Sequence, residues 1–506
     1  MAVKTAGDAP AFTPEQLQSV RGAWMSPRRL KTEVLGGLVV ALALIPEAIA
    51  FSIIAGVDPR IGLFASFTMA VTIAFVGGRP AMISAATGAV ALVTAPLVKS
   101  HGLDYLVAAV ILAGIFQIVL GLTGVAKLMR FIPLSVMVGF VNALAILIFM
   151  SQVPELMGVP WLVYPLTALG LLIVFGLPRL TKAVPAPLVA IVALTLITVT
   201  AAVVVPTVGD KGALPDSLPS LSLPNVPNTF ETLQVIFPFA LAMAFVGLLE
   251  SLMTAKLVDD ITDTRSAKTR EAWGQGVANI VTGCFGGMGG CAMIGQTMIN
   301  VKASGARTRI STFLAGVFLL ILVVALGDIV SLIPMAALVA VMIFVSVATF
   351  DWHSIRPATL KALPKSETTV MAATVVVTVA THNLAVGVGV GVLVAMVLFA
   401  RRVAHFVTVE RSVTEDDGGR ATYRVDGELF FASSNDLYTQ FEYALDPERV
   451  VIDMRDSHLW DASTIAALDA ITEKYRQHGK SVDVVGLNQA SALMRERLAG
   501  RLGAGH

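Results

Sequence analysis

The stretch Gly286-Gly-Met-Gly-Gly-Cys-Ala-Met-Ile-Gly-Gln-Thr-Met-Ile-Asn-Val-Lys-Ala-Ser-Gly-Ala-Arg-Thr-Arg309 lies among hydrophobic segments. Its apolar part is too short and too rich in glycine to cross a bilayer as a helix of about 20 residues. Irregular backbone survives at membrane depth only where protein or a water-filled cavity satisfies its amides and carbonyls. We therefore expect an extended segment over 286–291 and a half-helix over 293–303 that begins near mid-membrane. The free N–H groups and positive dipole end of such a helix favour an anion.

A second stretch of this kind runs over 77–96, where small residues lead into a short apolar helix that begins near Thr87. If the two stretches hold matching places in two halves of opposite topology, their N-termini face one midplane cavity, as in inverted-repeat transporters. The two helix ends together supply roughly one positive charge. The alternative is that both stretches are ordinary spans whose small residues serve helix packing.

The composition is that of a polytopic membrane protein. Hydrophobic residues make up 56% of the 506 residues and charged residues 14%, with a mean hydropathy of +0.78, whereas roughly a quarter of the residues in soluble domains are charged. The net charge of +1 gives no reason to expect a nucleic-acid partner. Cys284 and Cys291 are interpreted as small packing residues. The polar first 31 residues indicate no cleaved signal peptide.

The predicted fold is an all-α polytopic membrane domain of about fourteen spans, arranged as seven-plus-seven inverted repeats. Basic residues before the first span place the cytoplasmic N-terminal segment, 1–31, inside the cell. A Pro- and Ser-rich linker, 207–233, divides the membrane domain, 32–405, into repeat one, 32–206, and repeat two, 234–405. Because seven is an odd number, the second repeat must be inverted. The expected spans are 32–56, 61–77, 80–98, 104–124, 133–151, 161–177, 185–206, 234–256, 271–285, 288–304, 309–328, 332–350, 367–382 and 385–403.

Two carboxyl groups within these spans, those of Glu47 and Glu250, need a physical reason. A charged residue at the centre of a membrane helix costs about 2.5–3.5 kcal/mol on insertion scales, so it normally faces a cavity or a partner. One interpretation is a site for a coupling proton or cation, with Thr254 one turn after Glu250 on the same helix face. The other is structural, with both carboxyl groups hydrogen-bonded to opened backbone near the half-helices.

The composition changes after the last span, and residues 406–506 are predicted to form a small cytoplasmic α/β domain. Alternating or continuous apolar runs predict strands over 423–431, 450–454 and 482–485. Amphipathic segments predict helices over 434–445, 463–478 and 488–498.

The segment Ile45-Pro-Glu-Ala-Ile-Ala-Phe-Ser-Ile-Ile-Ala-Gly-Val-Asp-Pro-Arg-Ile-Gly-Leu-Phe64 resembles the first-span signature of the SulP (sulfate permease) family of anion transporters, which includes prestin and pendrin. The patterns on either side of the tenth span are similar too, and the C-terminal domain resembles a STAS domain. The residues that carry these further likenesses are Glu271, Gln275, Gly276 and Asn279, then 304–309, 425–430 and 461–465. The similarity runs from about residue 25 to residue 500, and its motifs occur in the family's order and spacing.

The resemblance implies a mobile core domain against a gate domain, a homodimer, and a substrate bound between the third and tenth spans. The substrate neighbourhood then consists of Thr87, Gly88, Ala89, Gly295, Gln296 and Thr297. Glu250 and Thr254 fall where sodium-coupled bicarbonate members have a cation-binding pair, so a sodium ion is the metal to consider there. Ser463 matches the phosphorylated serine of STAS-type anti-sigma antagonists, although serine at a helix start is more often a cap.

Two residues depart from the family pattern. Glu47 stands where the family usually has glutamine, which favours proton coupling over plain exchange. Thr297 stands where the animal members carry arginine, so an anion would depend on helix ends and hydroxyl groups, and chloride-type behaviour is not expected.

The sequence therefore predicts a secondary active transporter of small anions of the sulfate, bicarbonate or dicarboxylate class. It would be coupled to protons or sodium and work by elevator-like alternating access in the inner cell membrane, with the N-terminus and STAS domain cytoplasmic. Membrane lipid and a cytoplasmic partner of the STAS domain are the further partners expected, and no cofactor is expected. An anion channel and a membrane-anchored STAS sensor are the alternatives. An enzyme is not expected, because no set of nucleophile, base and orienting residue occurs at suitable spacing.

Overall fold

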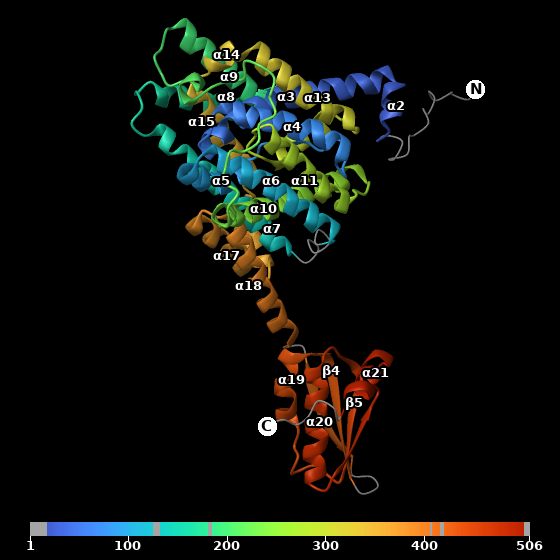
Figure 1. Cartoon of the computed structure of the whole chain (residues 1–506). Coiled ribbons are helices and arrows are strands. Elements are labelled where there is room, and N and C mark those ends of the chain that lie inside the picture. Colours follow the sequence, from blue (N-terminus) through green and yellow to red (C-terminus); the bar gives the residue numbers. More distant parts are fainter. Residues whose placement is uncertain (1–17, 125–131, 181–184, 405–406, 415–418, 500–506) are drawn as a thin grey trace, which may run out of the picture. The chain divides into compact units, whose positions relative to one another are not determined.

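The structure is a computed structural model that describes residues 18–124, 132–180, 185–404, 407–414 and 419–499. It divides into two compact units, Met1–Val392 and Leu393–His506 (Figure 1). The expected boundary at 405–406 and the first 17 residues of the N-terminal segment lie outside the described residues.

Every expected span corresponds to a helix. Seven described helices are long and apolar enough to cross a membrane, and three shorter apolar helices accompany them. The helices of the first half are α2 Val20–Trp24, α3 Pro27–Ala55, α4 Pro59–Val76, α5 Gly88–His101, α6 Leu103–Leu122, α7 Leu134–Gln152, α8 Val163–Leu180 and α9 Ala186–Thr200, with short turns η2 Pro154–Leu156 and η3 Val208–Lys211. Those of the second half are α10 Phe230–Thr262, α11 Lys268–Cys284, α12 Ile294–Met298, η4 Ile299–Ala303, α13 Arg309–Ala325, α14 Gly327–Ser331, α15 Met335–Thr349, α16 Pro357–Ala362, α17 Lys365–Thr381 and α18 Leu384–Ala404.

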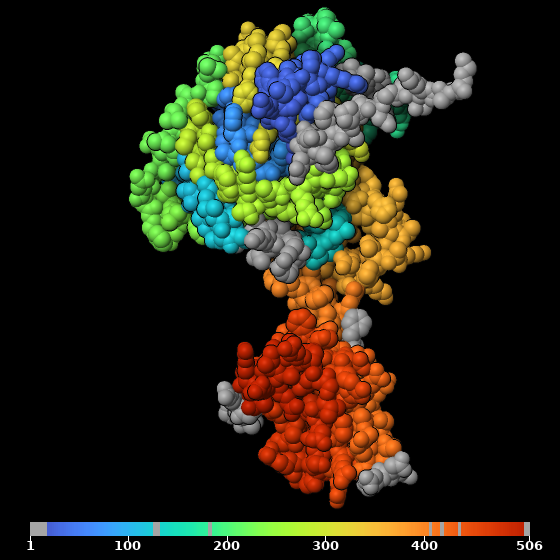
Figure 2. Space-filling model, turned by 90° about the vertical axis from the view of Figure 1, so that its right-hand side faces the viewer, coloured from blue at the N-terminus to red at the C-terminus, as the bar shows by residue number. Residues whose placement is uncertain are grey.

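The helices of the two halves interleave in two packed groups. One group joins α3, α4, α5 and α6 to α10, α11 and α13, and the other joins α7, α8 and α9 to α15 and α17. Figure 2 shows the blue helices of the first half against the yellow and yellow-green helices of the second on one face. Helices α6 and α11 approach closely where Gly114 meets Gly276. A Cβ atom at Gly114 would lie only 2.6 Å from the Gly276 carbonyl oxygen, so the contact depends on the absence of a side chain. Small residues at such crossings let helix backbones pack tightly in a membrane.

The membrane domain is not purely helical. A two-residue strand β1, Ser84–Ala85, pairs antiparallel with β2, Cys291–Ala292, so that Ser84 lies opposite Ala292 and Ala85 opposite Cys291. This corrects the all-α expectation at one point. The two extended segments that precede the half-helices satisfy part of each other's backbone, as irregular structure at membrane depth requires.

The packing of α3 against α13 includes a carboxylate that caps the neighbouring helix. Glu33 of α3 is 3% exposed, and its Oε1 accepts from the backbone N–H groups of Arg307 at 2.7 Å and Thr308 at 3.1 Å. Its Oε2 accepts from Ser311 N at 3.3 Å. Glu33 therefore satisfies N–H groups at the start of α13 that the helix itself cannot satisfy, and it ties α3 to α13.

The C-terminal unit contains a four-stranded sheet of order β3-β4-β5-β6. Strand β3, Thr408–Thr414, pairs antiparallel with β4, Arg420–Leu429, while β5, Arg449–Leu459, and β6, Ser481–Val485, continue the sheet in parallel. Helices α20 Ala462–Gln477 and α21 Gln489–Leu498 match expectation. Strand β3 has no counterpart among the expected strands. The helix expected over 434–445 is instead a short α19, Phe431–Leu437, followed by the turn η6, Tyr438–Gln440.

The core of this domain surrounds one buried carboxylate, that of Asp446. Tyr423 donates to Asp446 Oδ2 at 2.7 Å, Tyr475 donates to the same oxygen, and Arg411 Nε donates to Oδ1 at 2.8 Å. Burial raises the pKa of Tyr423 and Tyr475 above the ordinary tyrosine value and the pKa of Tyr443 to about 12. The tyrosine hydroxyls therefore remain protonated donors at neutral pH.

Replacing this carboxylate should destabilise the C-terminal domain. We expect Asp446→Ala to lower its free energy of unfolding by about 3 kcal/mol, because the buried hydroxyls of Tyr423 and Tyr475 lose a charged acceptor. Urea denaturation of the full chain, followed through hydrogen exchange of β4 and β5, measures the change. Asp456→Ala is the matched control, because the Arg424–Asp456 pair has the same chemistry but both side chains are exposed, so less than about 1 kcal/mol should be lost. Equal effects of the two substitutions would contradict the assignment.

Candidate functional site

The two half-helices begin side by side. Helix α5 starts directly after Thr87, and α12 starts after Met293 and continues as the π-helix η4 to residue 303. Met293 N donates to the Ile83 carbonyl oxygen at 2.9 Å, and Ile83 N donates to Thr297 Oγ1 at 3.0 Å. Together with the β1–β2 pairing, these bonds bring the two expected substrate stretches, 87–89 and 295–297, into one place.

Several backbone N–H groups at this place lack an acceptor. Gly88 and Ala89 at the start of α5, and Gly295 and Gln296 at the start of α12, donate to no described residue through their backbone. Helix geometry leaves such N–H groups unpaired unless a cap, water or ligand binds them. Gly295 is exposed, and a Cβ atom placed there would meet nothing within 4 Å. The site therefore opens at Gly295.

The opposite half-helix is more enclosed. A Cβ atom at Gly88 would lie 2.8 Å from Cε1 of Phe51 and 3.2 Å from Cδ1 of Ile148. The ring of Phe51, on α3, thus covers the start of α5, and only a residue without a side chain fits there.

The two threonine hydroxyl groups hold the site together. Thr87 Oγ1 accepts from Val90 N at 3.4 Å and lies 3.1 Å from Cys291 Sγ, while Thr297 Oγ1 accepts from Ile83 N. Both threonines are buried. Thr297 Oγ1 accepts the bond from Ile83, and its own O–H has no acceptor among the described residues. The Thr297 hydroxyl therefore remains a donor beside the free backbone N–H groups.

Glu47 connects α3 to α12. Gln296 Nε2 donates to Glu47 Oε1 at 2.8 Å. Gln296 is 1% exposed, and its Oε1 is buried without a hydrogen-bond partner among the described residues. Sequence reasoning placed Glu47 among coupling residues and Gln296 among substrate residues, and the structure joins the two.

Glu250 connects α10 to the strand that precedes α12. Cys291 Sγ donates to Glu250 Oε2 at 2.9 Å and also contacts Thr87 Oγ1. Thr254 donates its hydroxyl to the Glu250 backbone carbonyl at 2.8 Å. The interpretation of Cys291 as a mere packing residue is incomplete, because its thiol bridges Glu250 and the start of α5. No basic side chain of the described residues forms an ion pair with Glu47 or Glu250.

The sequence profile of the sulfate permease family matches residues 30–165 and 160–374, and that of the STAS domain matches residues 411–498. The chain belongs to the sulfate permease family. It is an integral membrane protein with a STAS domain, and its family consists of anion transporters rather than enzymes.

Three similar proteins illustrate the relationship. The chain is 54% identical over 470 residues to the Bacillus subtilis (strain 168) protein named "Putative sulfate transporter YbaR", covering 93% of this chain and 97% of the relative. The transmembrane domain of a cyanobacterium bicarbonate transporter, BicA, is 26% identical with a TM-score of 0.64, covering 73% of this chain and 98% of that one. Murine Solute Carrier 26 family member A9, an anion transporter in the inward-facing state, shares the fold at 16% identity, with a TM-score of 0.80 and coverage of 98% and 92%.

In this member of the family, polar side chains that sequence reasoning left without a role hold the extended segments in place. Asn279 donates to the Gly290 carbonyl at 3.0 Å and accepts from Gly290 N at 2.9 Å, so its amide replaces a strand partner. Ser251 and Ser66 accept from the backbone N–H groups of Ala292 and Ala86. Buried polar groups in an otherwise apolar span are the signal that could have found them, because such groups are almost always hydrogen-bonded.

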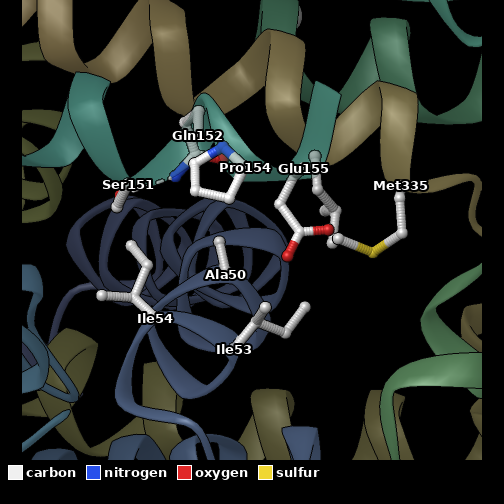
Figure 3. A pocket seen from close by; sticks show the side chains of 9 residues that line it. Ala50, Ile53, Ile54, Ser151, Gln152, Pro154, Glu155 and Met335 are labelled. Carbon is white, nitrogen blue, oxygen red and sulfur yellow. Dashed lines mark hydrogen bonds between the residues drawn. The ribbon is translucent and has the colours of Figure 1, made fainter. Parts of the chain in front are cut away.

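A hollow of about 250 Å³ lies elsewhere on α3. Figure 3 shows Ala50, Ile53 and Ile54 of α3 on one side, facing Gln152, Pro154 and Glu155. Residues three and seven positions after Glu47 share its helix face, yet none of the expected substrate residues lines the hollow. Glu155 is held by Lys211 at 2.6 Å. The hollow is therefore separate from the half-helix ends.

Ser463 of the STAS domain is exposed near the start of α20. The N-cap of this helix is Asp461, whose side chain accepts from Thr464 N at 3.1 Å. The alternative that Ser463 serves as the cap is thus wrong, and its hydroxyl remains accessible. No group of three or more His, Cys, Asp or Glu side chains suited to a metal ion occurs within the described part of the chain.

Proposed function

We propose that this protein is a secondary active transporter that binds a small anion of the sulfate, bicarbonate or dicarboxylate class between the starts of α5 and α12. The single observation that carries the proposal is the pair of half-helix ends joined through β1 and β2, with free backbone N–H groups beside the opening at Gly295. Two helix ends contribute roughly one positive charge, so an anion binds there without a basic side chain. The binding neighbourhood comprises Thr87, Gly88, Ala89, Gly295, Gln296 and Thr297.

The transport cycle proposed is elevator-like, with the group of helices that carries α5 and α12 moving as one body against the other group. Hydrogen bonds between the helices of the moving group support such rigid-body movement. Glu33 caps α13 from α3, Glu271 of α11 accepts from Gly78 N at 2.7 Å and Arg79 N at 3.0 Å after α4, and Arg309 of α13 donates to the Gly77 carbonyl at 2.6 Å. Such bonds oppose relative movement of α3, α4, α11 and α13.

Coupling to a proton or a sodium ion is assigned to the carboxyl groups of Glu47 and Glu250, with Thr254 beside the latter. Both carboxyl groups lie within membrane segments, and each accepts one hydrogen bond at the site, from Gln296 and Cys291 respectively. A carboxyl group at membrane depth without a basic partner marks an ion pathway by default. The proposal places the protein in the inner cell membrane with its N-terminus and STAS domain in the cytoplasm, where Ser463 is open to modification and to a protein partner. We further propose that the protein forms a homodimer.

Uptake by the purified protein in proteoliposomes tests this function. Radiolabelled sulfate, bicarbonate and succinate are offered separately under an imposed pH gradient, an imposed sodium gradient, and neither. We expect accumulation of at least one anion above its external concentration under one of the gradients. If each anion moves only down its own concentration gradient, a channel is favoured. If none of the three anions moves, a membrane-anchored sensor is favoured.

A further inference from the structure

The pair formed by Glu47 and Gln296 contains an unsatisfied atom. Gln296 Nε2 donates to Glu47 Oε1 at 2.8 Å, but Gln296 Oε1 is buried and has no hydrogen-bond partner among the described residues. A buried amide oxygen normally has a partner. Gln296 also stands next to Gly295, where the site opens.

The arrangement is the one that an ionised carboxyl group of Glu47 requires, and the carbonyl oxygen of a protonated carboxyl group can accept from the NH2 group as well. An ionised carboxylate only accepts hydrogen bonds, so the amide must turn its NH2 group toward Glu47. A protonated carboxyl group presents an O–H donor, for which the amide oxygen is the suitable acceptor. The two ends of a glutamine amide exchange places by a half-turn of the side-chain terminus, and which end faces a neighbour is decided by the hydrogen-bond network.

No neighbouring charged side chain among the described residues forms an ion pair that would fix the charge of Glu47. The titratable side chains on the elements that pack against α3 either are exposed or bind other groups, and none forms an ion pair with Glu47; they are Arg21, Arg60, Lys99, His101, Lys302 and Arg309. The nearest charged residue of α3 itself is Glu33, about 20 Å away along the helix, where it caps α13. The carboxyl group of Glu250 faces Cys291 instead.

We propose that the Gln296 amide couples a proton on Glu47 to the anion. Proton binding at Glu47 reverses the amide, so that Oε1 accepts from the carboxyl O–H and the released NH2 group donates to an anion at the start of α12. Loss of the proton returns the NH2 group to the carboxylate and leaves the amide oxygen toward the anion, which weakens binding. This inference rests on the proposed transport function and names the coupling ion at Glu47 as a proton.

The expected pH dependence follows from linkage. If only the protonated form binds the anion well, the apparent dissociation constant equals the intrinsic one divided by the protonated fraction of the protein. The KM therefore rises roughly tenfold per pH unit once the pH exceeds that at which Glu47 loses its proton. Affinity is therefore highest at low pH. Glu47→Gln keeps an amide N–H that can donate to Gln296 Oε1, so it imitates the protonated carboxyl group at every pH.

The test measures the KM for labelled sulfate in counterflow across proteoliposomes from about pH 5 to about pH 8, for the wild-type chain and three variants. We expect Glu47→Gln to remain active with a KM that changes less than about twofold over this range. Gln296→Ala should lose the pH dependence and bind sulfate weakly at every pH. Gln152→Ala removes a buried amide that donates to Ile148 O and Ser151 Oγ but touches no carboxyl group, and it should keep the wild-type pH dependence.

A spectroscopic measurement separates failure of this inference from failure of the transport function. The infrared C=O band of a protonated carboxyl group should appear on acidification of the wild-type protein, vanish in Glu47→Gln and change frequency in Gln296→Ala. Sulfate transport by Glu47→Gln with the full wild-type pH dependence would overturn the inference while leaving the transport function intact. Absence of any Glu47-dependent band over the same pH range would overturn it even if no sulfate moves.

Discussion

Substituting Gly295 by leucine is expected to reduce anion uptake roughly 100-fold while the protein folds normally. A Cβ atom at Gly295 meets nothing within 4 Å, so the new side chain enters the open space beside the free N–H groups of α12 without displacing other residues. An anion kept from these groups loses about two charge-assisted hydrogen bonds of about 1.5 kcal/mol each, and 1.4 kcal/mol corresponds to a factor of ten in affinity. Initial rates of labelled sulfate uptake into proteoliposomes measure the loss.

Gly389→Leu is the matched control for this substitution. Gly389 also lies in a helix, α18, and is exposed, and a Cβ atom placed on it would likewise meet nothing within 4 Å. It is remote in sequence from both half-helices, so its substitution should change uptake by less than about twofold. Normal uptake by Gly295→Leu would contradict binding of the anion at the start of α12.

Replacing Glu250 by glutamine is expected to remove one coupled ion from each transport cycle. Glutamine retains an oxygen that can accept from the Cys291 thiol, which preserves the contact between α10 and β2. Under an about hundredfold gradient of the coupling ion, one ion fewer per anion lowers the limiting accumulation ratio about 100-fold, because each tenfold gradient is worth 1.4 kcal/mol. Exchange of internal for external anion needs no net ion movement and should persist. Accumulation at equilibrium and counterflow, measured under separate pH and sodium gradients, give the two quantities.

Glu231→Gln provides the comparison on the same helix. Glu231 lies in the first turn of α10 and is exposed, so its neutralisation should leave the accumulation ratio unchanged. If Glu250→Gln accumulates the anion as the wild-type protein does, Glu250 has a structural function only, and the hydrogen bond from Cys291 is the reason for its place in the membrane.

The half-helices could be predicted because their cause is local. Glycines over 286–290 and the short apolar run that follows exclude a complete span, and the expected half-helix over 293–303 matches α12 and η4. Thr87 could be found as a helix start because threonine is a favoured N-cap, and its side chain accepts from Val90 N as expected of one. The positions of both stretches within their repeats then predicted that they would meet.

The contacts of the site could not be predicted because they join residues far apart in the chain. Cys291 and Thr87 are separated by 204 positions, and Gln296 and Glu47 by 249. Nothing in the local sequence indicates that a thiol will donate to Glu250 or that an amide will connect α12 to α3. Strand β3 escapes prediction for a different reason: its side chains are almost all exposed at the sheet edge, so it lacks the apolar alternation by which strands are found.

The position of a bound anion shows whether the half-helix ends form the binding site. Selenate has the shape and charge of sulfate and contains an anomalous scatterer, so crystals of the protein grown with selenate and measured at the selenium edge reveal its position. If the anion binds between α5 and α12, one strong peak lies within hydrogen-bonding distance of the backbone N–H groups of Gly88 or Ala89 and of Gly295 or Gln296. A peak confined to the hollow lined by Ala50 and Gln152, with none between α5 and α12, would contradict this binding site.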